Sequence, residues 1–243
     1  MVKTVVGSFD SFDEAQRVAR DLIDEGFMES DINVIASNAR GDFQDDARLA
    51  DRSGTTMPAG TITDRDTTTH KDHSGAATGA VTGGVVGGAA GLAASLMSLT
   101  IPGIGPIIAA GPIVATLTGA GVGAVAGGLI GGLTDIGVSK EHAEYYSEAV
   151  RRGGALVTVR ADESRAEQAA ELMREHGAID IDRRVERWRE TGWSGYDVNA
   201  TPYTRDQIDR DRELYGQAAS DSVTGAPLPR SFDYDDRTRG SNR

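Results

Sequence analysis

Cysteine is absent from the 243 residues of this chain, and aromatic side chains make up only 5% of it. Without cysteine there is no disulfide framework, no thiol nucleophile and no thiolate metal site. Basic residues are also fewer than acidic ones: the chain has 25 Lys and Arg and 37 Asp and Glu, which gives a formal net charge of -12. A protein that binds nucleic acid needs a basic face to neutralise phosphates. We therefore expect no nucleic-acid partner.

Charge is missing altogether from one long stretch. Residues 74–134 contain no Asp, Glu, Lys or Arg, although 26% of the chain is charged. Two rows of glycine in this stretch step by four residues, which places each row on one face of a helix and lets a neighbouring backbone approach closely. The expected helix-packing residues are Gly75, Gly79, Gly83, Gly87, Gly91, Gly119, Gly123, Gly127 and Gly131. This pattern predicts two helices that cross a membrane.

A break rich in proline and glycine separates the two rows and predicts the turn of a hairpin. Its residues are Pro102, Gly103, Gly105, Pro106, Gly111 and Pro112. As helices, residues 75–99 and 113–134 would extend roughly 37 and 33 Å, against a hydrocarbon layer about 30 Å thick. Two other interpretations stay open: a buried, water-soluble glycine-rich hairpin, or a low-complexity linker.

The sequence before this stretch is typical of a βαβ unit. Residues 2–9 alternate and are rich in β-branched side chains, which favours a strand. Ser11 and Glu14 have the spacing of a capping box at the start of a helix, and Gly26 is placed to end that helix. Residues 32–36 predict a second strand.

The sequence after the stretch repeats this pattern. Ser139 is placed to cap a helix that Gly153 and Gly154 close, and residues 155–160 predict a strand. A further helix is expected at 162–176 and a last strand at 178–182. Under a constant shift the helix-ending Gly177 falls on Gly26, so the chain contains two βαβ-like halves.

Together these patterns predict an α+β protein: a ferredoxin-like βαβ-βαβ sandwich interrupted by a two-helix glycine-zipper transmembrane hairpin, with a disordered linker and a disordered C-terminal tail. The polar, acidic segments lack the apolar surface that would offset their ordering entropy. The expected boundaries are 1–36 for the first half, 37–73 for the linker, 74–136 for the hairpin, 137–186 for the second half and 187–243 for the mostly disordered tail.

No residue set predicts catalysis, a cofactor or a metal. The segment 119–124 matches a loosened dinucleotide fingerprint, but it lies inside an apolar run without a preceding strand. His70 and His73 lie in the polar linker, where solvated side chains are the simpler interpretation. Asp180 and Asp182 alternate with isoleucines, as expected on the wet face of a half-buried strand. We therefore expect a protein that is not an enzyme.

Three motifs carry a resemblance: VVGSFDSFDEA near the N-terminus, IPGIGPIIAAGP in the break, and RRGGALVTV in the second half. With them the chain resembles the bacterial general stress protein family (YflT-type, heat-induced stress proteins) over roughly residues 2–36 and 75–185. The resemblance implies a stress-inducible, non-catalytic, membrane-associated protein. It brings no functional residues, and the acidic linker and tail depart from the family pattern.

We accordingly expect a non-enzymatic general stress response protein. Its cytoplasmic ferredoxin-like domain would be anchored in the cell (inner) membrane by the hairpin, since the N-terminus lacks the features of a secretion signal. Membrane lipid and further copies of the chain are the expected partners; a protein partner is left open. Two alternative functions are a regulatory module that senses a small ligand and a pore formed by several copies.

Overall fold

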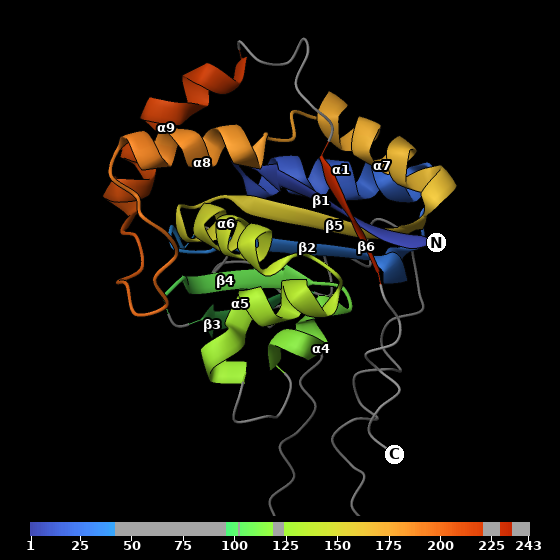
Figure 1. The fold of residues 1–243 in the computed structure, drawn as a ribbon, viewed down its shortest axis with the longest axis horizontal. Coiled ribbons are helices and arrows are strands. Elements are labelled where there is room, and N and C mark those ends of the chain that lie inside the picture. The colour runs from blue at the N-terminus through green and yellow to red at the C-terminus, as the bar shows by residue number, and fades with distance from the viewer. Residues whose placement is uncertain (42–95, 102, 119–123, 221–228, 235–243) are drawn as a thin grey trace, which may run out of the picture.

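The computed structural model describes residues 1–41, 96–101, 103–118, 124–220 and 229–234. Their framework is a six-stranded sheet in which all neighbouring strands are antiparallel, in the order β3-β4-β2-β5-β1-β6 (Figure 1). The strands are β1 (Val2–Phe9), β2 (Ile32–Ser37), β3 (Met97–Ile101), β4 (Gly105–Ala110), β5 (Ala155–Asp162) and β6 (Arg230–Asp233).

Helices cover both faces of this sheet, so the described residues form three layers (Figure 1). One face packs against α1 (Phe12–Asp24) and α7 (Glu163–Glu175). The other packs against α4 (Ile113–Thr118), α5 (Ala124–Asp135), α6 (Lys140–Arg151) and α8 (Ile181–Glu190). A short 3-10 helix (Glu29–Asp31) leads into β2, and α9 (Arg205–Ser220) follows α8 along the chain.

The local signals in the two flanking halves are confirmed. Ser11 accepts from the Glu14 backbone N–H while the Glu14 carboxylate accepts from the Ser11 N–H, which completes the capping box of α1. Ser139 caps α6. Gly26 has φ +83° just after α1, a conformation that glycine adopts without the steric cost of a side chain. Short-range chemistry therefore fixes these helix ends.

The central strands β1, β2, β4 and β5 are buried on both faces, which the alternating pattern alone did not predict. In β1, Val5 packs toward α1 and α7, whereas its neighbour Val6 packs toward α6 and α8. The polar Thr4 shares the Val6 face and is also fully buried, where its hydroxyl donates to the Ile136 carbonyl at 2.6 Å. The central strands thus present buried side chains to both layers of helices.

The expected transmembrane hairpin is wrong. Within the described ranges, no helix is both long and apolar enough to cross a membrane. α5 has 12 residues, which corresponds to roughly 18 Å, and Gly128 interrupts it with φ 39° and ψ -132°. The prediction of one continuous glycine-zipper membrane helix over residues 113–134 is therefore wrong.

The absence of charge in this segment has a different cause. Ile101, Ile104, Ile107 and Ile108 are β-branched, and β-branched side chains fit strands better than helices. β4 lies between β3 and β2, and its side chains are buried on both faces of the sheet: Ile108 in the core under α1 and α7, Ile107 in the core under α4 to α6. A strand buried in this way reads as a continuous apolar run. The described part of this segment thus builds two strands of the sheet and two of the helices that cover it.

The ferredoxin-like sandwich with a disordered tail is wrong as well. The expected last strand at 178–182 is reduced to a single bridge between Ser8 and Ile179, because Asp180 caps the start of α8 directly afterwards. The tail supplies α9 and also β6, which lies along β1 at the edge of the sheet (Figure 1). Ile208 of α9 is fully buried, so this polar-looking segment packs through an apolar anchor.

The predicted turn residues lie in a β-hairpin and not between two membrane helices. Gly103 belongs to the turn between β3 and β4, Pro106 lies in β4, and Gly111 and Pro112 form the turn before α4; Pro102 is outside the described residues. A Cβ at Gly103 would lie 2.4 Å from the Val198 carbonyl oxygen, so the chain after α8 packs closely on this turn.

Most of the predicted helix-packing glycines cannot be compared with the structure. Gly75, Gly79, Gly83, Gly87, Gly91, Gly119 and Gly123 lie outside the described residues, as do His70 and His73. Gly127 and Gly131 belong to α5. A Cβ added at Gly131 would meet no described atom within 4 Å, so no close backbone approach occurs there.

Candidate functional site

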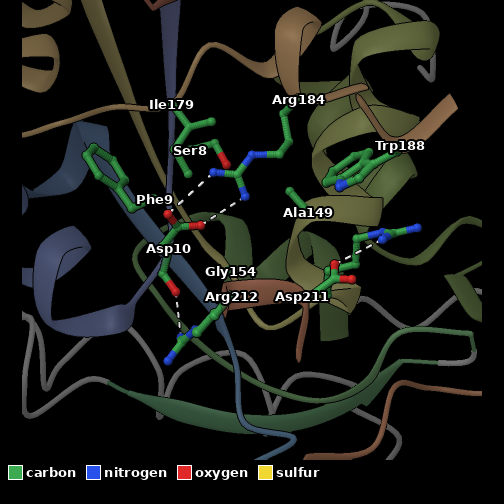
Figure 2. A pocket seen from close by; sticks show the side chains of 11 residues that line it. Ser8, Phe9, Asp10, Ala149, Gly154, Ile179, Arg184, Trp188, Asp211 and Arg212 are labelled. Atoms are coloured by element: carbon green, nitrogen blue, oxygen red, sulfur yellow. Dashed lines mark hydrogen bonds and ion pairs between the residues drawn. The ribbon is translucent and has the colours of Figure 1, made fainter. Parts of the chain in front are cut away.

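A cavity lies where the end of β1 meets the ends of α6, α8 and α9 (Figure 2). The empty space is about 380 Å³ when the part open to solvent is included, but the space that the centre of a water-sized sphere can reach is about 20 Å³, which is room for about one water molecule. Its charged lining consists of three arginines and two aspartates, and apolar residues and glycine complete the wall. The lining residues are Ser8, Phe9, Asp10, Ala149, Arg152, Gly154, Ile179, Arg184, Trp188, Asp211 and Arg212.

The end of α6 places Arg152 in the wall. Gly153 has φ +93°, and the Gly154 N–H reaches back to the Ala149 carbonyl at 3.0 Å, as in a glycine-terminated helix end. A Cβ at Gly153 would lie 2.4 Å from Cγ2 of Ile208. The same glycine therefore ends α6 and lets α9 approach it.

The start of α8 places Arg184 and Trp188. The Ile179 N–H donates to the Ser8 carbonyl at 2.8 Å, which fastens the chain to the edge of β1. The Asp180 carboxylate then accepts from the backbone N–H groups of Asp182 and Arg183 at 3.1 and 3.3 Å. With its first turn fixed, α8 points Arg184 toward Asp10 (Figure 2).

Asp10 is held by two arginines from two helices. Arg184 donates through both terminal nitrogens to the two carboxylate oxygens, at 3.1 and 3.4 Å. Arg212 of α9 donates to the Asp10 backbone carbonyl at 2.5 Å and to the Gly153 carbonyl at 3.3 Å. These bonds join the C-terminal helices to the end of β1.

A buried carboxylate holds the other side of the cavity. Glu148 is fully buried, and its Oε1 accepts from Arg151 at 2.9 Å and from Arg152 Nε at 2.6 Å. The second end of Arg152 donates to Asp211 of α9 at 2.9 Å. Burial acts to lower the pKa of Arg152, but the charges of Glu148 and Asp211 outweigh it, so that the pKa lies above its ordinary value.

Aromatic rings surround these guanidinium groups. The Arg152 guanidinium lies 4.7 Å from the centre of the Trp188 ring and 5.1 Å from that of Tyr203. Arg151 lies 5.2 Å from the same Tyr203 ring, so the tyrosine contacts both cations. Burial raises the pKa of the Tyr203 hydroxyl, and the Arg152 charge opposes this increase. Ring faces attract cations and exclude water from them.

Hydrogen-bond donors are in excess at this site. The Trp188 Nε1–H and the Arg151 Nε–H are buried, and neither finds an acceptor among the described residues. Trp188 is only 1% exposed, so bulk solvent does not reach its indole N–H. A buried donor without an acceptor costs about 1–3 kcal/mol. Arg151 and Arg152 pair with Glu148 and Asp211, and Arg184 pairs with Asp10. The Arg212 guanidinium bonds only to backbone carbonyls among the described residues, so its charge has no carboxylate partner there, in a chain whose net charge is -12.

Sequence reasoning did not find this site. The segment RRGG at 151–154 indicated only the end of a helix, and Trp188 fell in the expected tail. The site joins β1, α6, α8 and α9, whose residues lie far apart in the sequence. The one available signal was the density of arginine in residues 183–189.

No protein-family model, curated protein or solved structure matches this chain.

Proposed function

We propose that the chain is a non-enzymatic regulatory module that binds a small oxyanion, a phosphate or a carboxylate, in the cavity between α6, α8 and α9. The observation that carries this proposal is the concentration of donors at one cavity: three part-buried guanidiniums line it, and so does the buried Trp188 indole N–H, which has no acceptor among the described residues. Planar guanidiniums are suited to the geometry of phosphate and carboxylate oxygens.

Arg212 is the best placed of these groups to receive a ligand. Its two hydrogen bonds within the described residues both use one terminal nitrogen and go to backbone carbonyls. A guanidinium carries five N–H donors, so Arg212 keeps others for an oxyanion. An incoming oxyanion also accepts from the Trp188 indole N–H and removes the cost of that buried donor.

The chemistry of the lining favours binding over catalysis. Arginine stays protonated in proteins and cannot exchange a proton near neutral pH, whereas general acid–base catalysis needs a group with a pKa near the working pH. The lining guanidiniums therefore position and neutralise charge.

Binding at this cavity has a regulatory consequence because its wall spans the molecule. Asp10 directly follows β1, whereas Asp211 and Arg212 belong to α9. A ligand bound between them stabilises the docked position of α9 by its preference for that state. The fraction of molecules in which α9 is docked then depends on the concentration of the oxyanion.

The test is thermal and chemical unfolding of the full chain with increasing inorganic phosphate or malonate, with sodium chloride at matched ionic strength as a reference. A ligand at one hundred times its dissociation constant raises the free energy of unfolding by about 2.7 kcal/mol. We expect this increase from phosphate or malonate and not from chloride. Equal effects of all three salts contradict the proposal.

Two matched variants locate the effect. Arg212→Gln removes a cavity donor and is expected to abolish the ligand-dependent increase. Arg174→Gln removes the same charge from α7 on the other face, where its partner is Glu171, and is expected to leave the increase intact. Since the quantity compared is the increment with ligand, a lower basal stability of either variant does not affect the result.

The stress-response setting comes from the sequence resemblance and is a proposal in its own right. We propose that oxyanion binding serves a bacterial stress response. Its test is the abundance of the protein before and after heat and osmotic shock. Constant abundance contradicts the setting and leaves the binding proposal standing.

A further inference from the structure

The two edges of the sheet differ in their protection. The edge formed by β6 is four residues long and carries Arg230 and Asp233, which pair with Asp182 and Lys3. The edge formed by β3 reads Met-Ser-Leu-Thr-Ile and contains no charge, proline or glycine. Proteins protect sheet edges with short strands, charges and prolines. β3 is also short, with five residues, but it has neither charge nor proline, and among the described residues it pairs only with β4.

The pairing of Pro106 in β4 shows which backbone groups of β3 point away from the sheet. Thr100 lies opposite Pro106 in β4, and the Pro106 carbonyl accepts from the Asn38 N–H next to β2. Pro106 therefore faces β2, and Thr100–Pro106 is a pair without hydrogen bonds between β3 and β4. The N–H and C=O groups of Thr100 point away from β4, and by alternation so do those of Ser98.

We infer that this edge pairs with β3 of a second copy of the chain, antiparallel about a two-fold axis at Leu99. Ser98 then lies opposite Thr100 of the other copy, so that the outward N–H and C=O groups of both residues form four backbone hydrogen bonds. Leu99 faces its own counterpart in the non-hydrogen-bonded pair between them. The register satisfies the alternation of an antiparallel ladder on both sides of the axis.

The side chains fit the same register. Met97 is 48% exposed and lies opposite Ile101, which gives an apolar pair on the face of α4 and α5. Ser98 and Thr100 are exposed and pair on the opposite face, where hydroxyl pairs are favourable across strands. Under this two-fold axis, apolar side chains contact apolar side chains and hydroxyls contact hydroxyls. A self-complementary strand of this kind is suited to pair with a second copy.

A proline substitution tests the backbone bonds directly. Ser98→Pro removes an outward N–H and takes no hydrogen bond from the β3–β4 ladder, whereas Ser98→Thr keeps the N–H. In sedimentation equilibrium of the full chain, the native protein and Ser98→Thr are expected to be dimers, and Ser98→Pro is expected to be a monomer at the same concentration. A monomeric native chain, or a dimer of Ser98→Pro, overturns the inference.

A single cysteine gives a second measurement that does not depend on tolerance of proline. The chain has no cysteine, and non-hydrogen-bonded pairs have Cα atoms about 4.5 Å apart, within reach of a disulfide. Leu99→Cys is expected to form a covalent dimer under mild oxidation, whereas Ser231→Cys on the β6 edge is not. Equal cross-linking of the two variants, or none at position 99, contradicts pairing at this edge.

Discussion

The two faces of the sheet differ in what they bury. The α1/α7 face is filled by Ala, Val, Leu, Ile, Phe and Met side chains. The α6/α8 face contains Tyr146 and Trp188 and lies against the buried ion pairs of Glu148. Apolar packing needs only shape and volume, whereas a buried charge needs a particular partner. The first face therefore serves stability, and the second also carries the site.

Removal of the buried carboxylate is expected to have the largest effect on the second face. Glu148→Ala leaves Arg151 and Arg152 without their shared acceptor, and breaking a buried ion pair from one side costs about 4 kcal/mol. Urea unfolding measures this loss. Glu171→Ala on the exposed side of α7 is the control; equal losses for the two variants would show that the buried network does not matter for stability.

A cavity on the first face is expected to have a somewhat smaller effect. Leu22 is fully buried between α1 and the sheet, and Leu22→Ala costs about 3 kcal/mol. The increase in stability with phosphate is expected to be unchanged in this variant, since no ligand-binding group lies on that face. If Leu22→Ala abolishes the phosphate response as Arg212→Gln does, the division between the two faces fails.

Alkaline pH is expected to weaken the second face selectively. Burial raises the pKa values of Tyr145, Tyr146, Tyr196 and Tyr203 above the ordinary value of 10.0. Below pH 10 these hydroxyls are protonated in both states; above it the unfolded chain loses protons first, so stability falls as pH rises through the folded pKa values. Stability measured from neutral to strongly alkaline pH is expected to fall in this range.

Tyr203→Phe and Tyr196→Phe sharpen this prediction. Phenylalanine has no hydroxyl to titrate, so the alkaline loss of stability is expected to be smaller in each variant than in the native chain. Absorbance titration gives an independent reading of the same groups. Titration of every tyrosine at its ordinary pKa would contradict burial of this aromatic cluster.

The smallest effect is expected on the exposed side of α7. A hydrogen bond from Arg174 lowers the pKa of Glu171 below its ordinary 4.5. A lowered carboxyl pKa contributes stability above that ordinary value, and the contribution is lost as the pH falls through the folded pKa. Because the pair is exposed, solvent screens it. Glu171→Gln is expected to be nearly neutral at pH 7; a large loss there would show that α7 depends on charge after all.

Sequence reasoning predicted the elements whose ends are set by local chemistry. The Ser11–Glu14 capping box, the Ser139 cap and the glycines at 26, 153 and 177 act within a few residues, so they can be found from spacing alone. The sheet partners of residues 97–110 were missed because a strand buried on both faces and a membrane helix both lack charge. Hydrophobicity alone did not distinguish the two.

The candidate site could not be predicted because its partners are distant in sequence. Arg184 and Asp10 are 174 residues apart, and Arg212 and Asp10 are 202 apart. In the sequence, each of these arginines lies in a polar segment, where a solvated side chain is the simplest prediction. Only the bridge at Ile179 and the glycine end of α6 bring these groups to one cavity.

The most direct test of oxyanion binding at this cavity is the indole N–H signal of Trp188 in a proton–nitrogen correlation spectrum. The chain contains two tryptophans, and Trp193 also has a buried indole N–H but does not line the cavity. On titration with phosphate or malonate, the Trp188 signal is expected to move to higher proton frequency as the indole gains an acceptor, while that of Trp193 changes little. A Trp188 signal that stays in place, or that moves equally with chloride, would contradict the site.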